Sequence, residues 1–224
     1  MSFSTADTYY ENGLAAIERG CLEAAEREFR RAVETDPSHA SGWSKLGWLT
    51  FGLGRDLNDA RSCLERAVNL DPALGIARVY LGVVYNRLER VADSEASFLL
   101  ALELGDHLAL VHAVYAEEFL WRRSRYGDAE ENFRAALDHD SESVLALRDY
   151  ARMLACHGRD TEARRYFEKA ISLDPDDRFT IKAYEEFLQE VAAEDRDPTE
   201  CLQAAVDKDK NYTEGIRCLE RRQS

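Results

Sequence analysis

The chain has 224 residues, of which 45% are hydrophobic and 32% charged, an ordinary composition for a soluble helical protein. Its formal net charge of −14 argues against non-specific binding to nucleic acid or to an anionic membrane, because phosphate recognition needs clustered Lys and Arg. The sequence shows no apolar run long enough for a transmembrane helix and no signal peptide, and its five cysteines form no CxxC pair. We therefore expect free thiols and a cytoplasmic location, with no membrane insertion.

The first recurring pattern lies at 24–37, AAEREFRRAVETDP, and places Ala25, Phe29, Ala32 and Pro37 at steps of four, three and five. The same steps recur later in the chain, twice with most residue types kept and twice in weaker form. The later copies are Ala60, Leu64, Ala67 and Pro72; Ser94, Phe98, Ala101 and Asp106; Ala129, Phe133, Ala136 and Ser141; and Ala163, Phe167, Ala170 and Pro175. This fixed period indicates an array of structural repeats.

The chemistry of one copy predicts a pair of helices. The two alanines and the large residue between them share one helix face, and the alanines let a neighbouring helix approach closely. Proline then ends the helix, because the residue before it is pushed out of the α region. A second helical pattern precedes most copies, as in WSKLGWL at 43–49, so each period holds two antiparallel helices that need neighbouring pairs to bury their apolar faces.

In chain order, the expected helices cover 5–19, 22–35, 38–51, 58–70, 73–89, 92–104, 107–123, 128–139 and 178–193, together with a pair in the fifth repeat, its first helix around 147–154 and its second ending before Pro175. Asn58 and Asp160 are the expected N-caps of their helices. The segment 52–54, Gly-Leu-Gly, breaks the chain between helices, and RRSRYGD at 122–128 is one residue longer than the repeat requires. At the end, 178–224 holds a divergent sixth helix and helices that cap the array, with docking onto a partner or a second copy as the alternative.

These residues resemble the tetratricopeptide repeat family. The second repeat supplies Trp43, Leu46 and Gly47 in its first helix, and the third supplies Leu81, Gly82 and Tyr85. The resemblance implies an all-α fold, a right-handed superhelical solenoid of antiparallel helix pairs. Its five repeats would cover 1–177, at about 6–39, 40–74, 75–108, 109–143 and 144–177.

Catalytic signatures are absent from the sequence. It contains no GxxxxGK[ST], HExxH or GxSxG motif, and Gly52-Leu53-Gly54 lacks the third glycine of a nucleotide loop. His107 and His112 are five residues apart, whereas two metal ligands on one helix face are four apart. We therefore expect a chain that is not an enzyme and that holds neither a cofactor nor a metal ion.

The resemblance further implies that the first helices line a concave groove that binds a peptide or a partner helix. The expected partner-binding residues are Tyr10, Leu14, Ser44, Lys45, Trp48, Val79, Tyr80, Val83, Arg87, Glu117, Trp121, Arg148 and Arg152. The helix at 41–52 is apolar on two sides, which gives an independent reason to look there. Trp43 should be buried within its pair, and Trp48 should either face a partner or pack on the next repeat.

The chain is thus predicted to be a non-catalytic scaffold or adaptor whose partner is a protein or peptide, amphipathic or mixed apolar-acidic, rather than nucleic acid. Of the positions at which chaperone-binding members clamp a terminal carboxylate, only Lys45 is basic, so that clamp is not expected. Three alternatives remain open: a chaperone or assembly factor for one client, a structural protein that self-associates through its terminal helices, and an enzyme built on a helical-repeat scaffold.

Overall fold

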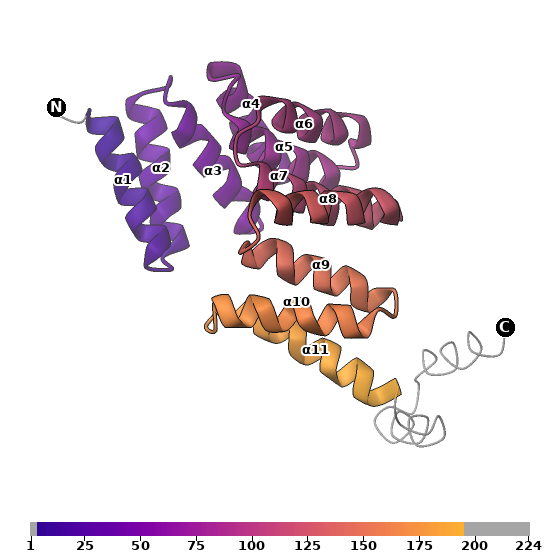
Figure 1. The fold of residues 1–224 in the computed structure, drawn as a ribbon. Helices are drawn as coiled ribbons and strands as arrows, with labels where there is room; N and C mark the ends of the chain where they lie inside the picture. The colour runs from indigo at the N-terminus through magenta and orange to yellow at the C-terminus, as the bar shows by residue number, and fades with distance from the viewer. Residues whose placement is uncertain (1–3, 195–224) are drawn as a thin grey trace, which may run out of the picture. The chain divides into compact units, whose positions relative to one another are not determined.

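The structure is a computed structural model that describes residues 4–194, with side chains through 192, and every regular element in that range is helical (Figure 1). The helices expected within 198–224 lie outside the described residues. The elements are α1 (Thr5–Glu18), α2 (Leu22–Thr35), α3 (Ala40–Gly52), α4 (Leu57–Leu70), α5 (Gly75–Arg87), α6 (Val91–Leu104), α7 (Leu108–Tyr115), η1 (Ala116–Leu120), η2 (Trp121–Arg123), α8 (Tyr126–His139), α9 (Val144–Cys156), α10 (Asp160–Leu173) and α11 (Arg178–Glu194). None of these helices is long and apolar enough to cross a membrane.

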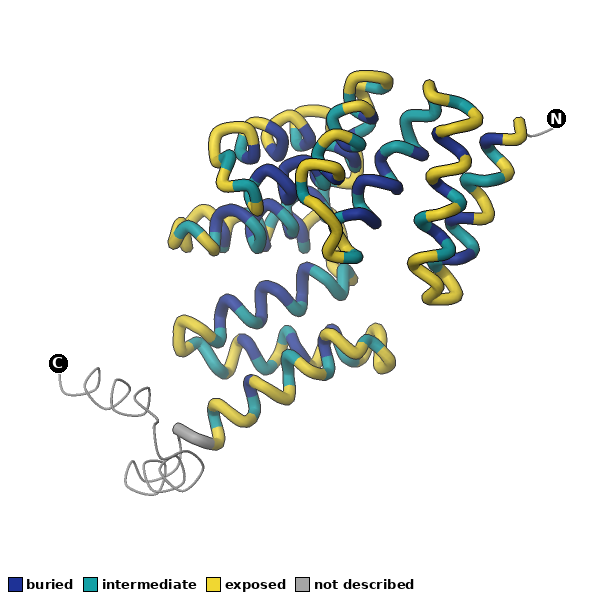
Figure 2. The backbone as a smooth tube through the Cα atoms, turned by 180° about the vertical axis from the view of Figure 1, so that it is seen from behind, coloured by how far each residue is buried: buried dark blue, intermediate teal, exposed yellow. Residues whose placement is uncertain are grey.

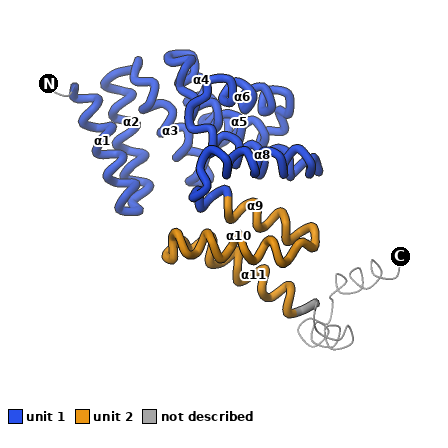
Figure 3. Tube along the Cα trace, viewed as in Figure 1, with its two compact units in different colours: residues 1–146 blue, residues 147–224 orange. Residues whose placement is uncertain are grey.

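The chain divides into two compact units, 1–146 and 147–224, and the division falls inside α9 (Figure 3). In the first unit, α1 pairs with α2, α3 with α4, α5 with α6, and α7 with α8. In addition, α2 packs on α3, α4 on α5 and α6 on α7, while α3 contacts α5, which contacts α7. In the second unit, α10 packs against α11. The all-α fold of helix pairs expected from the repeats is confirmed.

The recurring Ala-Phe-Ala residues form the core, as predicted. Ala25, Phe29 and Ala32 are completely buried, and so are Ala163, Phe167 and Ala170. The intermediate copies behave alike, although their flanking residues differ, and Phe98 and Phe133 are fully buried too. Figure 2 shows the result as buried stripes along helices whose opposite faces are exposed.

A glycine on the first helix receives the large residue of the second helix in three of the pairs. A Cβ added at Gly13 would lie 2.6 Å from the Phe29 ring, one at Gly47 would lie 2.7 Å from Leu64 Cγ, and one at Gly82 would lie 2.9 Å from the Phe98 ring. Any larger residue would push the helices apart. The glycines therefore set the spacing within these three pairs.

A second repeated feature joins consecutive pairs. The Tyr85 hydroxyl donates a hydrogen bond to Glu65 Oε1 over 2.8 Å, and the Arg90 guanidinium lies 4.4 Å from the Tyr85 ring centroid. One repeat later, the Tyr115 hydroxyl donates to Glu95 over 3.3 Å, and Arg125 Nη1 lies 2.6 Å from that carboxylate. An acid on one second helix, a tyrosine on the next first helix and the arginine that follows thus hold neighbouring pairs together.

Both expected N-caps are wrong. Asn58 lies inside the first turn of α4, and the cap is Asp56, whose Oδ1 accepts hydrogen bonds from the backbone N–H groups of Asn58 and Asp59 at 2.6 and 3.4 Å. Asp160 is the first residue of α10, and the preceding cap position is Arg159, whose side chain makes no capping hydrogen bond. Several short polar residues stand near each start, and sequence spacing alone did not distinguish among them.

The helix expected over 107–123 is also not regular. It begins as α7, continues as the π-helical turn η1 and ends as the 3₁₀ turn η2. A π turn accommodates one extra residue within a helix. The sequence at 122–128 is one residue longer than the repeat requires, and the wider π turn just before it accommodates that extra residue.

The spacing glycines lead to a matched test on one helix. We expect Gly47→Ala to lower the free energy of unfolding by about 1–3 kcal/mol, because its methyl group would overlap Leu64 and the Ala60 carbonyl oxygen. Gly52→Ala on the same helix should raise stability by up to about 1 kcal/mol, because a Cβ there meets open space and alanine favours the helix. Urea unfolding of both variants measures the difference, and destabilisation by both changes alike would contradict it.

The junction tyrosine leads to a test against pH. Burial, together with the hydrogen bond to Glu65, raises the pKa of Tyr85 to about 12 from an ordinary value of 10.0. The folded state therefore holds the phenol proton more tightly, so this contribution to stability is complete below pH 10.0 and is lost as the pH rises toward about 12. The wild-type chain should be more stable than Tyr85→Phe near neutral pH, and the difference in unfolding free energy should shrink across that window. A difference independent of pH would contradict the assignment.

Candidate functional site

One face of α3 stays open between its neighbours. Its inner residues Leu46, Gly47 and Thr50 are buried, whereas Ser41, Lys45, Trp48 and Gly52 stand at steps of four, three and four on the other side, and none of these four is buried. Two of them, Lys45 and Trp48, belong to the predicted binding residues. The open stripe of α3 is therefore the starting point for a candidate site in the first unit.

Trp48 lies between two first helices. Its ring stacks on Tyr80 of α5 with centroids 4.3 Å apart and planes 13° from parallel, and its centroid lies 5.3 Å from that of Phe51. The tryptophan thus packs on the next repeat, which was one of its two expected roles, and yet both Trp48 and Tyr80 remain partly exposed. Together they form an apolar surface that joins α3 to α5.

Tyr10 of α1 extends this aromatic surface. Its ring centroid lies 5.5 Å from that of Phe29 and 5.0 Å from that of His39, so one side of the ring is packed on the core. Burial raises the pKa of Tyr80, with a smaller contribution from the charge of Tyr10. Leu14, one turn further along α1, packs against the same core cluster and is partly buried.

Lys45 is the unusual charge in this region. It is partly buried, and burial alone lowers its pKa. It makes no hydrogen bond or ion pair with any residue in the part of the chain that the structure describes. A lysine ammonium beside Trp48 and without an acidic neighbour is held in a position that favours an incoming anion.

Three predicted contact residues have almost no exposed surface. Ser44, Val79 and Val83 expose 2%, 1% and 2% of their surface, because the interhelical packing covers them. Direct contact with a partner would therefore require a change in helix packing. These side chains lie beneath the exposed residues of the same helices.

Trp43 differs from its prediction in the other direction. It was expected to be buried, yet it is only partly buried, and its indole N–H donates to the Pro37 carbonyl over 3.0 Å.

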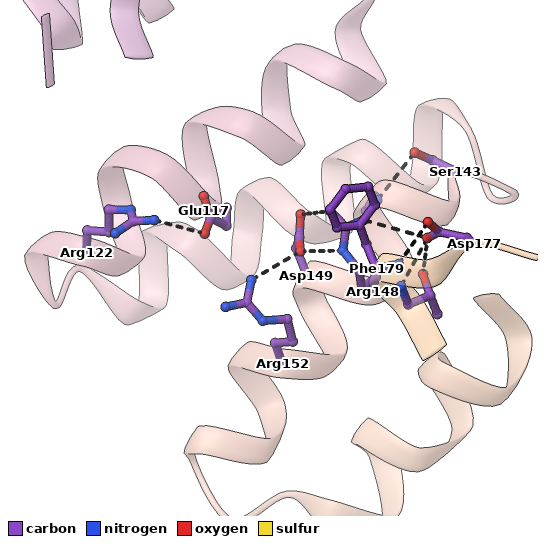
Figure 4. Close-up of polar contacts among 10 residues, drawn as sticks. Glu117, Arg122, Ser143, Arg148, Asp149, Arg152, Asp177 and Phe179 are labelled. Carbon is purple, nitrogen blue, oxygen red and sulfur yellow. Dashed lines mark hydrogen bonds and ion pairs between the residues drawn. The ribbon is translucent and has the colours of Figure 1, made fainter. Parts of the chain in front are cut away.

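Arg87 and Glu117 belong to a charged network around the π turn. Arg87 Nη2 lies 2.8 Å from Glu118 Oε2, and Arg122 lies 3.4 Å from Glu117 and 3.2 Å from Glu118 (Figure 4 shows the Arg122–Glu117 pair). Asn86 donates a hydrogen bond to the Glu118 carbonyl oxygen within the π turn. Trp121, the next predicted residue, follows this turn and is partly buried. Glu118 is the member that the sequence analysis missed, although the extra residue near 122–128 pointed to this region.

In the second unit, Arg148 and Arg152 converge on one carboxylate. Arg148 donates from Nε and Nη2 to the two oxygens of Asp149 at 2.9 and 3.0 Å, and Arg152 Nη1 lies 3.4 Å from Oδ1 (Figure 4). Asp149 is 5% exposed. A second acid, Asp177, lies with its Oδ2 3.7 Å from Arg148 Nη1. Both predicted arginines therefore have acidic partners of their own. The sequence analysis missed Asp149, which stands one residue after the first arginine and three before the second.

Phe179 is a second residue that the sequence analysis missed. It is the second residue of α11, its backbone N–H donates to Asp177 Oδ1 over 3.2 Å (Figure 4), and it is 75% exposed. The buried face of α11 instead carries Thr180 and Phe187. A single exposed phenylalanine is common on protein surfaces and does not by itself mark a binding site. Its place outside the spacing of Ile181, Tyr184 and Leu188 was the available signal.

The described residues include no group of three or more His, Cys, Asp or Glu side chains that could hold a metal ion. His112 shares a 2.8 Å hydrogen bond with Asn132 Oδ1 and stacks on His139 with centroids 5.7 Å apart. These imidazoles have structural neighbours within the first unit. The surfaces described above offer aromatic, apolar and charged contacts, which suit recognition of another chain.

Comparison with known proteins places these surfaces in context. In the curated set, the chain is 25% identical over 208 residues to the peroxisomal targeting signal receptor of Kluyveromyces lactis, an overlap of 74% of this chain and 36% of that protein. A shorter match, 35% identical over 65 residues, covers 29% of this chain and 7% of the Saccharomyces cerevisiae protein "Essential for maintenance of the cell wall protein 1". The chain thus spans little more than a third of the length of the first relative and far less of the second.

Solved structures share the fold. A thermophilic tetratricopeptide repeat protein of Thermus thermophilus superposes with a TM-score of 0.75 at 19% identity, covering 83% of this chain and 100% of that one. PilW, a type IV pilus biogenesis factor, superposes with a TM-score of 0.69 at 16% identity, covering 97% and 99%. The family model described as "Tetratricopeptide repeat" matches residues 10–58, 51–109 and 120–178, well over half of the chain. The chain therefore belongs to the tetratricopeptide repeat family.

Proposed function

We propose that this chain is a non-catalytic interaction scaffold that binds a peptide or partner helix over the open surface formed by Tyr10, Lys45, Trp48 and Tyr80. Tetratricopeptide repeats generally mediate protein–protein interactions, and family membership makes this the expected role. Apolar side chains of the partner would lie against the Trp48–Tyr80 stack. An acidic side chain of the partner would lie at Lys45.

Lys45 is the observation that carries this proposal. A partly buried ammonium loses hydration, and it makes no ion pair among the residues of 4–192 to offset that loss. A partner carboxylate would supply the missing interaction in a place where water screens it less than at an open surface. Binding would accordingly restore the lowered pKa of Lys45 toward its ordinary value.

The predicted arginines are weaker candidates for the anion contact. Arg87 is paired with Glu118, while Arg148 and Arg152 are both paired with Asp149. A partner would have to compete with an acid already in place. We therefore propose the same mixed apolar-acidic partner that the sequence predicts, with its acidic side chain bound by Lys45 and not by one of the arginines.

The curated relative supports a binding role in general terms. It is called a receptor, which is a protein that recognises another molecule, and three quarters of this chain aligns with part of it. What that receptor recognises is not carried over, since this chain spans 36% of its length. We further propose a cytoplasmic setting, because Cys21, Cys63 and Cys156 are free thiols.

Selection of peptides from a random display library on the full chain tests the partner chemistry. Sequences that combine apolar residues with Asp or Glu should be enriched. Lys45→Met should weaken the best of these peptides by about tenfold, equivalent to about 1.4 kcal/mol, and Lys45→Arg should retain most binding. Lys182→Met is the control, because Lys182 is 77% exposed on α11 and its loss changes net charge equally. Unchanged binding by Lys45→Met, or enrichment without acidic residues, would contradict the proposal.

The two tryptophans of α3 separate folding from binding. Trp43→Ala should lower the free energy of unfolding by about 3 kcal/mol, because the ring packs on the core and also lies 4.6 Å from the Arg66 guanidinium. Trp48→Ala should lower it by only about 1.5 kcal/mol, chiefly through the lost stack with Tyr80. The Trp48 variant should nevertheless bind the selected peptides more weakly by about 2 kcal/mol or more. Thermal melts and titrations measure both effects, and intact binding by a folded Trp48→Ala chain would move the site elsewhere.

A further inference from the structure

The outer face of α6 carries apolar side chains where a surface helix is usually polar. Its inner face is buried through Ser94, Phe98 and Ala101. On the opposite side Ala92, Ala96 and Leu99 stand in one exposed row, and Leu100 lies beside them. Leu99 and Leu100 are 45% and 42% exposed. A helix that is apolar on both faces has a second surface to cover.

This face is an exception within the chain itself. The two residues that follow the large buried residue occupy the same place in every repeat. They are Arg30-Arg31, Glu65-Arg66, Leu99-Leu100, Arg134-Ala135 and Glu168-Lys169. The other four pairs carry at least one charge. The packing of a repeat therefore does not require leucine at these positions, since the other repeats carry at least one charged residue there. Two leucines exposed to water do not stabilise the fold.

The charge around the leucines is negative. Glu103 follows Leu99 by one turn in the same exposed row and forms no ion pair within the described residues. The carboxyl end of α6 adds its partial negative charge, and exposed Asp106 follows two residues beyond the helix. The other acids of α6 are already neutralised, because Asp93 pairs with Arg90 and Glu95 pairs with Arg125.

Charge selects among the possible occupants of this face. Glu103 is the acid of α6 left without an ion pair among the described residues, and the helix carries no basic residue, so a second copy packed through the same face would bring Glu103 toward Glu103. A helix with apolar residues on one face and Lys or Arg beside them complements both features. The alanines at 92 and 96 leave room for such a helix to approach closely.

We propose that the outer face of α6, consisting of Ala92, Ala96, Leu99, Leu100 and Glu103, binds a basic amphipathic helix of another protein. The apolar residues of that helix pack on the two leucines and over the two alanines, and one of its basic side chains pairs with Glu103. This face lies on a second helix of the array. It is separate from the surface at Lys45, which the first helices form, and it takes a partner of opposite charge.

A labelled helical peptide of leucine and lysine, with the leucines on one face, tests the proposal by titration against the full chain. The double change Leu99→Glu and Leu100→Arg installs the pair found at Glu65-Arg66 in the second repeat. It should leave the melting temperature unchanged and should weaken binding by about tenfold or more. Ala96→Arg keeps both leucines, fills the space left for the incoming helix and adds a positive charge, so it should weaken binding as well and keeps the test valid if the double variant folds poorly.

Glu34 provides a matched control for charge, because it occupies in α2 the place that Glu103 occupies in α6. Glu103→Gln should weaken peptide binding by about threefold, whereas Glu34→Gln should leave it unchanged. Equal effects of the two changes would mean that the peptide responds only to the overall charge, and this would overturn the proposal. Binding of the double variant as tight as that of the wild type would also overturn it. So would concentration-dependent self-association that the double variant abolishes, since the occupant would then be a second copy.

Discussion

The close approach of a glycine to a large apolar side chain is the contact on which the first three helix pairs depend. Gly13 lies against Phe29, Gly47 against Leu64, and Gly82 against Phe98, at separations that exclude a Cβ. The fully buried alanines on either side of the large residue extend the contact along the helix. With spacing inside a pair set in this way, the remaining faces of the helices are free to carry different residues, and the candidate sites lie on these faces.

The fold could be predicted from the sequence because this packing repeats. The same residue types must return at the same interval, and they do so even where the pattern weakens, as at Phe98 and Phe133. Local details escaped prediction where several residues compete for one role. Asp56 rather than Asn58 caps α4, because the geometry of the preceding loop decides which oxygen reaches the free N–H groups.

The candidate site was less predictable, because its chemistry depends on partners distant in sequence. Arg87 and Glu118 are 31 residues apart, and nothing in the local pattern announces that they pair. The same holds for Lys45, which stands out because no acidic side chain among the described residues pairs with it. The family resemblance pointed to the first helices as the binding surface and supplied Trp48 and Tyr80 as candidates. It did not separate side chains that reach solvent from those beneath them, such as Val79 and Val83.

The π turn at Ala116–Leu120 shows how the array deals with a change in length. An extra residue in an α-helix would rotate everything after it by about 100° and would move each buried side chain off its face. Here the wider turn takes up that rotation, so Phe119 stays buried and Ala129 and Phe133 resume the pattern in α8. The Asn86 side chain binds the Glu118 carbonyl within this turn. A repeat can therefore hold an extra residue while the helix that follows keeps the phase of its buried face.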